Sequence, residues 1–513
     1  MEGTCADPIF RTRRVKCDEA KPACARCISA KRKCGYDPVN SPPRKASPEP
    51  VIVQQPALSS APWGLHPATD YERQNFNLLR TLIVNQINGG IKSEFWTKNL
   101  LQATYVYPAV WHAALALAAM YQRATCVLNN QDPHFAAEYY AFAVRQFSAS
   151  VGFIIGMNHS RVSGPEQEML LTTTALYTGI CLLRGDLAQA KTHALYLAKL
   201  SLQWRFLEDE DDHNVVDGVI GRANTKQLLR DVCYSFNTLL CFSDEMMEHF
   251  TVAVSHDTRP YASLDDAYYA YINIHSSWTK IKDWEPDHFS TTGASPAPGH
   301  MQERQHALNL WAIRFEAYLQ LGTYTQEDAY LIEQLQLFHL FEDTFDTIMI
   351  HRTPEIWAKN AHKWERILKG AERLLEKQNY CETGTVPQKS IFYYSLSVQQ
   401  VLRMTGFICR NGIIRRRIIK LLQQWQHCDG LWDNELSWRM VEAKMLKEES
   451  ALAAAAPASC DCVPDLFFCI DHRVAGVTTE LLDDGCMLVR MQTGLELKQG
   501  LPGDEVRFQL KRR

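Results

Sequence analysis

A regular spacing of apolar residues, which runs through most of the chain, predicts long amphipathic helices. The clearest example follows Pro354, where apolar residues recur at intervals of four, three, four, three and four positions. The residues of this stripe are Trp357, Ala361, Trp364, Leu368, Ala371 and Leu375. Because an α-helix turns once in about 3.6 residues, this spacing places all of them on one face. The predicted fold class is therefore mainly α, with a large multi-helix body.

Comparable helical patterns recur over most of the chain beyond residue 108. They are predicted at residues 109–124, 134–155, 166–183, 187–204, 226–242, 301–321, 327–350, 390–410, 413–425 and 434–449. Ser163 and Glu166 have the spacing of a capping box, which marks a helix start. Gly185 and Asp186 then separate two of these helices, which predicts an antiparallel pair.

The period of the apolar residues changes to two beyond residue 474. Segments 474–481 and 486–491 flank Asp483, Asp484 and Gly485, a turn sequence typical of a hairpin. Val506, Phe508 and Leu510 continue the alternation. We therefore expect a short C-terminal β appendage.

Proline marks the segments where the chain is not helical. Residues 38–62 contain seven prolines, and since proline fixes φ and lacks an N–H, they predict an extended linker. Residues 284–300 and the Ala/Pro-rich stretch around 451–457 are predicted to be surface loops.

Charge is distributed unevenly along the 513-residue chain. Its 54 Lys and Arg against 58 Asp and Glu give a net charge of −4, yet residues 1–46 hold eleven basic and five acidic side chains. A small cationic head on an acidic body indicates a polyanionic partner at that end. A solvated basic tail is the alternative interpretation.

Targeting and membrane signals are missing from the sequence. The first 34 residues lack the apolar run of a secretory signal, and no run of about 18 apolar residues could span a bilayer. We therefore expect an intracellular protein with no membrane partner, whose 16 cysteines are mostly reduced. Closely spaced cysteines are then better candidates for metal ligands than for disulfides.

Four closely spaced cysteines near the start of the chain predict a metal site. Cys17, Cys24, Cys27 and Cys34 follow the spacing C-x6-C-x2-C-x6-C. Two thiolates spaced C-x2-C can bind one metal from a single turn, and further thiolates complete a tetrahedral site. Metal binding would fold a segment that is too short and too polar to form a core.

Basic residues lie next to and between these cysteines, where they can reach a nucleic acid. The candidate DNA-binding residues are Arg11, Arg13, Arg14, Lys16 and Lys21. Arginine can pair with guanine through two hydrogen bonds, and both arginine and lysine bind phosphate. The segment is therefore a candidate DNA-binding module.

Residues 11–36 resemble the fungal binuclear zinc-cluster transcription factors, whose pattern is C-x2-C-x6-C-x(5–12)-C-x2-C-x(6–9)-C. The four cysteines match the third to sixth positions of this pattern. The resemblance implies Zn²⁺ as cofactor and sequence-specific binding to double-stranded DNA, often at CGG triplets. It also implies base contacts for Arg13 and Arg14, phosphate contacts for Arg11 and Lys16, and a turn at Lys21.

The resemblance is incomplete at its start. By spacing, the first two cysteines of the family would fall at positions that are Asp7 and Phe10 in this chain. Phe10 has no donor atom, whereas Asp7 offers an oxygen ligand. The resemblance implies one or two zinc ions, and with two cysteines missing we expect at most one, bound weakly.

The body has a second resemblance, to the helical regulatory domain of the same factors, because residues 95–122 resemble its start and residues 412–449 a segment near its end. The implied domains are an incomplete zinc-cluster module at 1–37, a Pro-rich linker at 38–62, a regulatory domain at 63–450, and a linker with the β appendage at 451–513. The resemblance implies a nuclear transcription regulator that works with the transcription machinery. A homodimer stays open, since the linker shows no heptad repeat.

Motifs of common enzymes are missing. The sequence contains no HExxH, GxSxG, GxGxxG or P-loop motif, so we expect no enzyme. Two alternatives stay open. One is a family relative that has lost DNA binding and acts through protein partners, and the other is a helical scaffold or enzyme of unknown activity.

Two further groups of residues are interpreted as structural. Cys460, Cys462 and Cys469 lack a partnered histidine or a second C-x2-C pair, so we expect core or surface thiols. Residues 415–417, three consecutive arginines, are either a second basic patch or the polar face of a helix. We favour the polar face, with Ile413 among the residues that point inward.

Overall fold

The structure is a computed structural model in which the chain divides into two units, Met1–Ala61 and Pro62–Arg513. The described residues are 28, 29, 31, 68–87, 93–157, 162–206, 218–240, 257–276, 298–351, 353–379, 391–394, 397–425, 428–429, 432–454, 460–482 and 486–509. The predicted Pro-rich linker lies outside them. The second unit is mainly helical, which confirms the predicted fold class.

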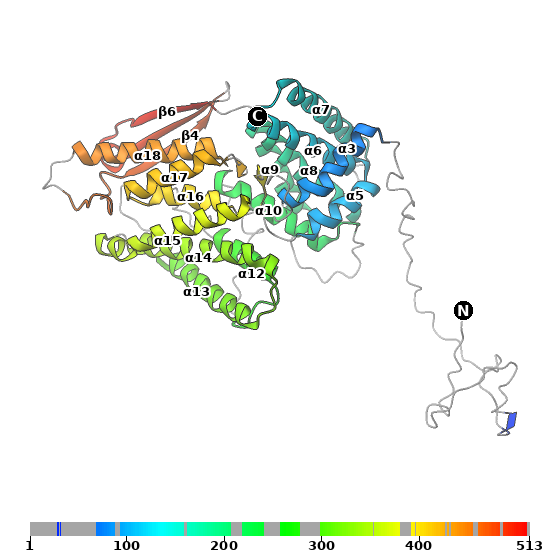
Figure 1. Ribbon diagram of the computed structural model, residues 1–513, viewed down its shortest axis with the longest axis horizontal. Coiled ribbons are helices and arrows are strands. Elements are labelled where there is room, and N and C mark those ends of the chain that lie inside the picture. Colours follow the sequence, from blue (N-terminus) through cyan, green and yellow to red (C-terminus); the bar gives the residue numbers. More distant parts are fainter. Residues whose placement is uncertain are drawn as a thin grey trace. The chain divides into compact units, whose positions relative to one another are not determined.

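The second unit contains these elements in chain order (Figure 1). Its helices are α3 (Asp70–Leu78), α4 (Val84–Ile87), α5 (Leu100–Val106), α6 (Pro108–Leu128), α7 (Pro133–Ile155), α8 (Gly164–Arg184), α9 (Leu187–Gln203), α10 (Arg222–Leu240), α12 (Leu264–Ser276), α13 (Pro298–Leu321), α14 (Ala329–His351), α15 (Pro354–Asn379), α16 (Val398–Ile408), α17 (Gly412–Gln424), α18 (Asn434–Ala454) and α19 (Gly494–Gln499). Its strands are β1 (Phe392–Tyr393), β2 (Cys428–Asp429), β3 (Trp432–Asp433), β4 (Val474–Leu481), β5 (Cys486–Thr493) and β6 (Asp504–Gln509). None of the described helices is both long enough and apolar enough to cross a membrane.

Helix α6 lies at the centre of the first hydrophobic core. Pro108 occupies its first position, where the missing N–H would have no partner within the helix. Every residue from Ala113 to Tyr121 is buried, and the many alanines let neighbouring helices approach closely. Helix α6 therefore packs against both α7 and α8 (Figure 1).

Helices α8 and α9 form the predicted antiparallel pair. Ser163 and Glu166 make the expected capping box, and Gly185 ends α8 with a φ of 77°. Only glycine adopts this left-handed conformation without strain, so the chain reverses within two residues. Asp186 then caps α9 by accepting a hydrogen bond from the backbone N–H of Gln189 at 3.1 Å.

Helices α12 to α17 enclose a second hydrophobic core. The predicted stripe on α15 faces it, and its buried members are Trp357, Trp364, Leu368, Ala371 and Leu375. Trp311 of α13 stacks on Phe315, and its Nε1 donates to the carbonyl of Ala267 on α12 at 2.8 Å. The period read from the sequence therefore identified the face of α15 that packs.

A short extended segment, residues 391–394, replaces the first turns of the helix predicted at 390–410. It includes strand β1, and α16 begins only after it. Tyr394 stacks on Trp96 with ring centroids 5.4 Å apart, and its hydroxyl donates to the carbonyl of Ala175 on α8 at 2.8 Å. Burial of three consecutive aromatic side chains favours extended backbone here, which overrides the helical pattern.

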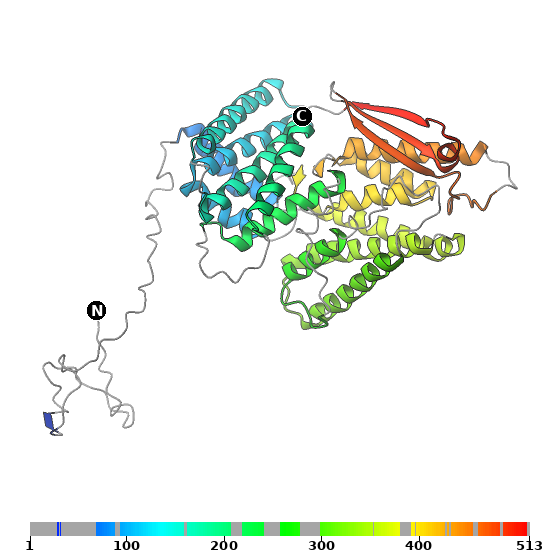
Figure 2. The same ribbon diagram turned by 180° about the vertical axis from the view of Figure 1, so that it is seen from behind.

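The C-terminal residues form the predicted β appendage, an antiparallel sheet in the order β4-β5-β6. Val477 pairs with Met491, and Val489 pairs with Val506. Because side chains alternate along a strand, one face of the sheet is apolar and packs on α18 (Figure 2). The buried residues of this contact are Leu436, Met440, Val474, Val489, Met491 and Phe508.

Two predicted loops begin or end differently from expectation. Helix α13 already starts at Pro298, a residue favoured in a first helical turn, so the end of the 284–300 loop is helical. Helix α18 continues to Ala454 because alanine is the strongest helix former, so the start of the 451–457 loop is helical too.

Candidate functional site

The predicted metal-binding and DNA-binding residues lie outside the part of the chain that the structure describes. These residues are Cys17, Cys24, Cys27, Cys34, Arg11, Arg13, Arg14, Lys16 and Lys21. Between the last two cysteines, Ile28 and Ser29 are helical and exposed. Lys31 has a left-handed φ of 49°, and its N–H donates to the carbonyl of Ile28 at 3.1 Å, which ends this short turn.

The donor set in this segment fits zinc. Four cysteines supply four thiolates, the number that a tetrahedral zinc ion requires. At the position of the family's second cysteine, Phe10 supplies no donor atom. The residues present therefore suit one zinc ion.

A buried ionic cluster lies where α17, α18 and β4 meet. Glu448 accepts a hydrogen bond from Nη2 of Arg415 at 2.6 Å, and Nη1 of Arg410 lies 3.4 Å from the same carboxylate oxygen. The other oxygen of Glu448 accepts from the backbone N–H of Val474 at 3.1 Å. Burial raises the pKa of Glu448, but the two guanidinium groups outweigh it and hold the pKa below its ordinary value.

This cluster corrects the prediction for residues 415–417. Arg415 is only 1% exposed, and Ile413, which was predicted to point inward, is 69% exposed. Arg416 and Arg417 do fit the predicted polar face. Arg416 pairs with Glu449 at 2.8 Å, and Arg417 pairs with Glu365 at 2.9 Å. The three arginines are thus ion-paired side chains that join α17 to α15 and α18.

A second buried ionic cluster joins α12, α13 and α14. Arg304 donates to Glu342 and to Asp346, and Glu342 also pairs with Nδ1 of His275. Burial raises the pKa of Asp346 to about 7, and Arg304 opposes that rise. The side chains of Arg304, Glu342 and Asp346 are at most 2% exposed, so this cluster holds helices together inside the core.

A shallow groove lies between α18 and β6, with Trp438, Lys447 and Arg507 among its lining residues. Lys447 forms ion pairs with Glu496 at 3.0 Å and with Asp504 at 2.9 Å. The groove therefore presents charges of both signs, and its lysine ties α18 to the sheet.

Comparison with known families bears on the N-terminal cysteines. The family model described as the fungal Zn(2)-Cys(6) binuclear cluster domain matches residues 11–42. The match includes all four cysteines and all five basic residues that were predicted to bind metal and DNA, and it starts beyond Asp7 and Phe10. This confirms the resemblance seen in the sequence, and the zinc-cluster module implies zinc binding.

Two curated relatives are fungal proteins named as transcription regulators. The chain is 28% identical over 203 residues to the aspercryptin biosynthesis cluster-specific transcription regulator atnN of Emericella nidulans, covering 36% of this chain and 32% of the relative. It is 25% identical over 224 residues to the transcription regulator lscL of Purpureocillium lilacinum, covering 40% of this chain and 50% of the relative. The matches thus span at most half the length of these relatives. No solved structure gives a significant match.

Far along the chain from the zinc-cluster module, the structure brings together a group that the sequence interpretation missed. His472 Nδ1 lies 3.2 Å from Sγ of Cys469 and 3.5 Å from Sγ of Cys462. The expectation that Cys460, Cys462 and Cys469 lack a partnered histidine is therefore wrong. The signal was the C-x2-H spacing of Cys469 and His472, which follows the C-x-C pair closely.

Proposed function

We propose that this protein is a nuclear transcription regulator that binds specific DNA sequences through its zinc-cluster module. The observation that carries the proposal is the family match over residues 11–42, where four cysteines and five basic side chains share one short segment. The names of the two curated relatives, both transcription regulators, support the same function. The protein is thus assigned as a regulator and not as an enzyme.

Zinc would be held in the module by Cys17, Cys24, Cys27 and Cys34. The metal, when bound by these thiolates, supplies a fixed tetrahedral centre around which a short polar segment can fold. The cysteines then set the directions of the basic side chains between them. Without such a centre the segment has too few apolar residues to build a core.

In this proposal, different basic side chains contact the bases and the phosphates. Arg13 and Arg14 would reach base edges, where a guanidinium group can donate two hydrogen bonds to O6 and N7 of guanine. Arg11, Lys16 and Lys21 would bind phosphates, which positions the module without reading sequence. The partner in this proposal is double-stranded DNA that contains CGG triplets.

The helical body would carry regulation. We assign residues 1–37 to the zinc-cluster module, 38–62 to a linker, 63–450 to the regulatory domain and 451–513 to a linker with the β appendage. The enclosed cores and buried ionic clusters of the body give it a fixed surface. That surface is suited to contacts with the transcription machinery.

DNA binding by the full-length protein tests the proposal. Fluorescence anisotropy with a CGG-containing duplex should show binding that disappears with a zinc chelator and exceeds binding to a scrambled duplex. Three phosphate contacts predict about 40-fold weaker binding at 200 mM than at 50 mM salt, since each contact contributes about −0.9 to the logarithmic slope. The stoichiometry of the complex then reports whether the protein binds as a monomer or a homodimer.

Three variants separate the roles of the basic residues. R14A should lose about 1–3 kcal/mol of discrimination for CGG, whereas K16A should weaken binding to all duplexes and lower the salt slope by about 1. R416A, which removes an exposed arginine of the body, is the matched control. It should leave the discrimination for CGG, the affinity and the salt slope unchanged. No binding in the presence of zinc, or binding that ignores both chelator and salt, would contradict DNA recognition and favour action through protein partners.

A further inference from the structure

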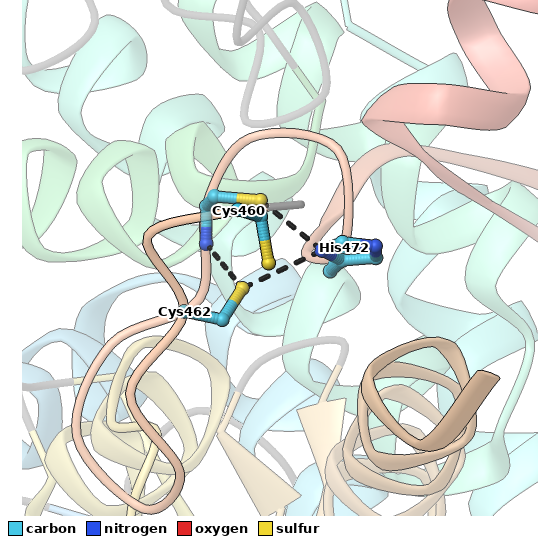
Figure 3. A group of neighbouring side chains, drawn as sticks. Cys460, Cys462 and His472 are labelled. Atoms are coloured by element: carbon cyan, nitrogen blue, oxygen red, sulfur yellow. Dashed lines mark hydrogen bonds between the residues drawn. The ribbon is translucent and has the colours of Figure 1, made fainter. Parts of the chain in front are cut away.

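Four potential metal ligands converge in the loop that joins α18 to β4. Cys460 and Cys462 lie in the first part of this loop, and Cys469 and His472 lie near its end. One ligand atom from each residue lies within 4.8 Å of every other. Figure 3 shows the sulfur of Cys462 directed at the ring of His472. Among the described residues this is the group with the geometry of a metal site.

We propose that Cys460, Cys462, Cys469 and His472 form a structural zinc site that is separate from the zinc-cluster module. Three thiolates and one imidazole are a common donor set of structural zinc. They fill all four positions of a tetrahedral ion, which leaves none for a substrate or a water molecule. The site therefore serves folding and not catalysis.

Two distances in the group are close to those that zinc imposes. Zinc lies about 2.3 Å from thiolate sulfur and about 2.0–2.1 Å from imidazole nitrogen, so in a tetrahedron sulfur and nitrogen are about 3.6 Å apart. The separations of 3.2 Å and 3.5 Å between His472 Nδ1 and the sulfurs of Cys469 and Cys462 lie close to that value. Small side-chain rotations would therefore complete the coordination.

The backbone around the group is also arranged for a metal. The N–H groups of His472 and Arg473 both donate to the carbonyl of Cys469, at 3.3 Å and 3.1 Å, so residues 469–472 form a tight turn. A turn of this kind presents its first and last side chains to the same ion. The N–H of Cys469 also donates to Sγ of Cys462 at 3.1 Å, and such a bond favours the thiolate that binds metal.

A metal here would add to the contacts that already anchor the junction between α18 and β4. The loop is anchored by Phe467 and Phe468, which are buried, and by Asp465, which accepts the N–H of Gly412 at the start of α17 at 2.9 Å. It leads into Val474, whose N–H binds Glu448 of α18. Zinc would fix the loop between these anchors and so hold the β appendage against α17 and α18.

Zinc content of the full-length protein tests the proposal. In a variant that combines C17S, C24S, C27S and C34S, the zinc-cluster module has lost its four predicted zinc ligands and keeps only Cys5, while the body is unchanged. Mass spectrometry for metals should still find one zinc per chain in this variant, and adding C462S and C469S should remove it. Adding C486A instead, a cysteine of β5 outside the group, should leave that zinc in place.

A second measurement needs no substitution in the body of the protein. Cobalt added to the metal-free module variant should produce the visible absorption of a tetrahedral cobalt–thiolate site, and zinc should abolish it. The proposal fails if the module variant holds no zinc and no tetrahedral cobalt, or if thiol alkylation finds two of the three cysteines joined in a disulfide. Failure of DNA binding would leave this site untouched, because its readout is metal content.

Discussion

The carboxylate of Glu448 shows how one buried charge can hold three elements together. It accepts hydrogen bonds from Arg415 of α17 and from the backbone of β4, while it sits on α18. Ions lose their hydration when they are buried, so such a group is tolerated only while its partners are present. Removing one partner leaves the opposite charge buried and unpaired.

Glu448→Ala is therefore expected to lower the free energy of unfolding by about 3–5 kcal/mol, because Arg415 and Arg410 stay buried without a counter-charge. Urea denaturation of the purified protein measures this. The neighbouring pair of Glu449 and Arg416 has the same chemistry but is exposed, so E449Q should change the free energy by less than about 0.5 kcal/mol. Equal effects of the two substitutions would contradict the claim that Glu448 compensates two buried charges.

The same residue gives the protein a defined response to acid. The pKa of Glu448 is lower in the folded protein than its ordinary value of 4.5, so below that pH the unfolded chain takes up the proton more readily. Stability contributed by this carboxylate is present above pH 4.5 and is lost as the pH falls through the folded-state pKa. The stability of E448Q should consequently fall less steeply in acid than that of the unmodified protein.

At this scale the sequence predicted residue types better than residue partners. The helical period placed the arginines of 415–417 on one helix, but it could not tell which of them faces inward. Glu448, 33 positions along the chain, decides that. In the same way, the three cysteines near residue 465 were visible, whereas their histidine became apparent only when the turn of residues 469–472 brought it to them.

At the scale of the elements, Gly179 is a point where α8 approaches Tyr394 of the extended segment closely. A Cβ at this position would collide with the hydroxyl of Tyr394 and lie 3.0 Å from its Cζ. That hydroxyl is fixed by its hydrogen bond to Ala175, and Tyr394 is 1% exposed, so it has no room to withdraw.

We expect Gly179→Ala to lower the free energy of unfolding by about 1–3 kcal/mol through overpacking, although alanine is the better helix former. Gly152 on α7 is the matched control, since a Cβ there would meet nothing within 4 Å. G152A should raise the free energy of unfolding by about 0.5–1 kcal/mol. Thermal unfolding followed by circular dichroism compares the two, and a stabilising G179A would rule out the close contact.

Elements with a strong local signal were predicted well, and those defined by distant contacts were not. The capping box at Ser163, the turn at Gly185 and the antiparallel pairing of β4 with β5 each rest on residues that are close in the sequence. Strand β1 owes its extended shape to Trp96 and α8, which lie far from it in the sequence. No local pattern carries that information, which is why the helix was predicted to begin too early.

At the scale of the whole molecule, the hydrophobic clusters formed by the described residues lie within residues 68–508. These residues belong to the unit Pro62–Arg513. Deleting residues 1–61 is therefore expected to shift the midpoint of thermal unfolding by less than about 2 °C. The same deletion should abolish DNA binding, because it removes the zinc-cluster module.

Scanning calorimetry of the full-length and shortened proteins measures the shift. The anisotropy assay with the CGG duplex, run on the same samples, supplies the control for DNA binding. A fall of more than about 5 °C would show that the first 61 residues contribute to the stability of the body.

Composition and charge already indicated the division of the chain into two units, since seven prolines separate the basic head from the acidic body. The cysteine pattern went further and predicted the family whose model matches residues 11–42. What the sequence could not give is the arrangement of the helices, because it depends on which faces meet across the cores.

The aromatic segment at residues 391–394 sets the order in which the protein can mature during translation. It completes a core whose other buried residues lie between Ala68 and Val232. Ribosomes add about 5–20 residues per second, so roughly 8–30 s pass between the synthesis of that earlier region and the arrival of Tyr394. During this interval the earlier region lacks the three buried side chains of Ile391, Phe392 and Tyr394 that complete its core.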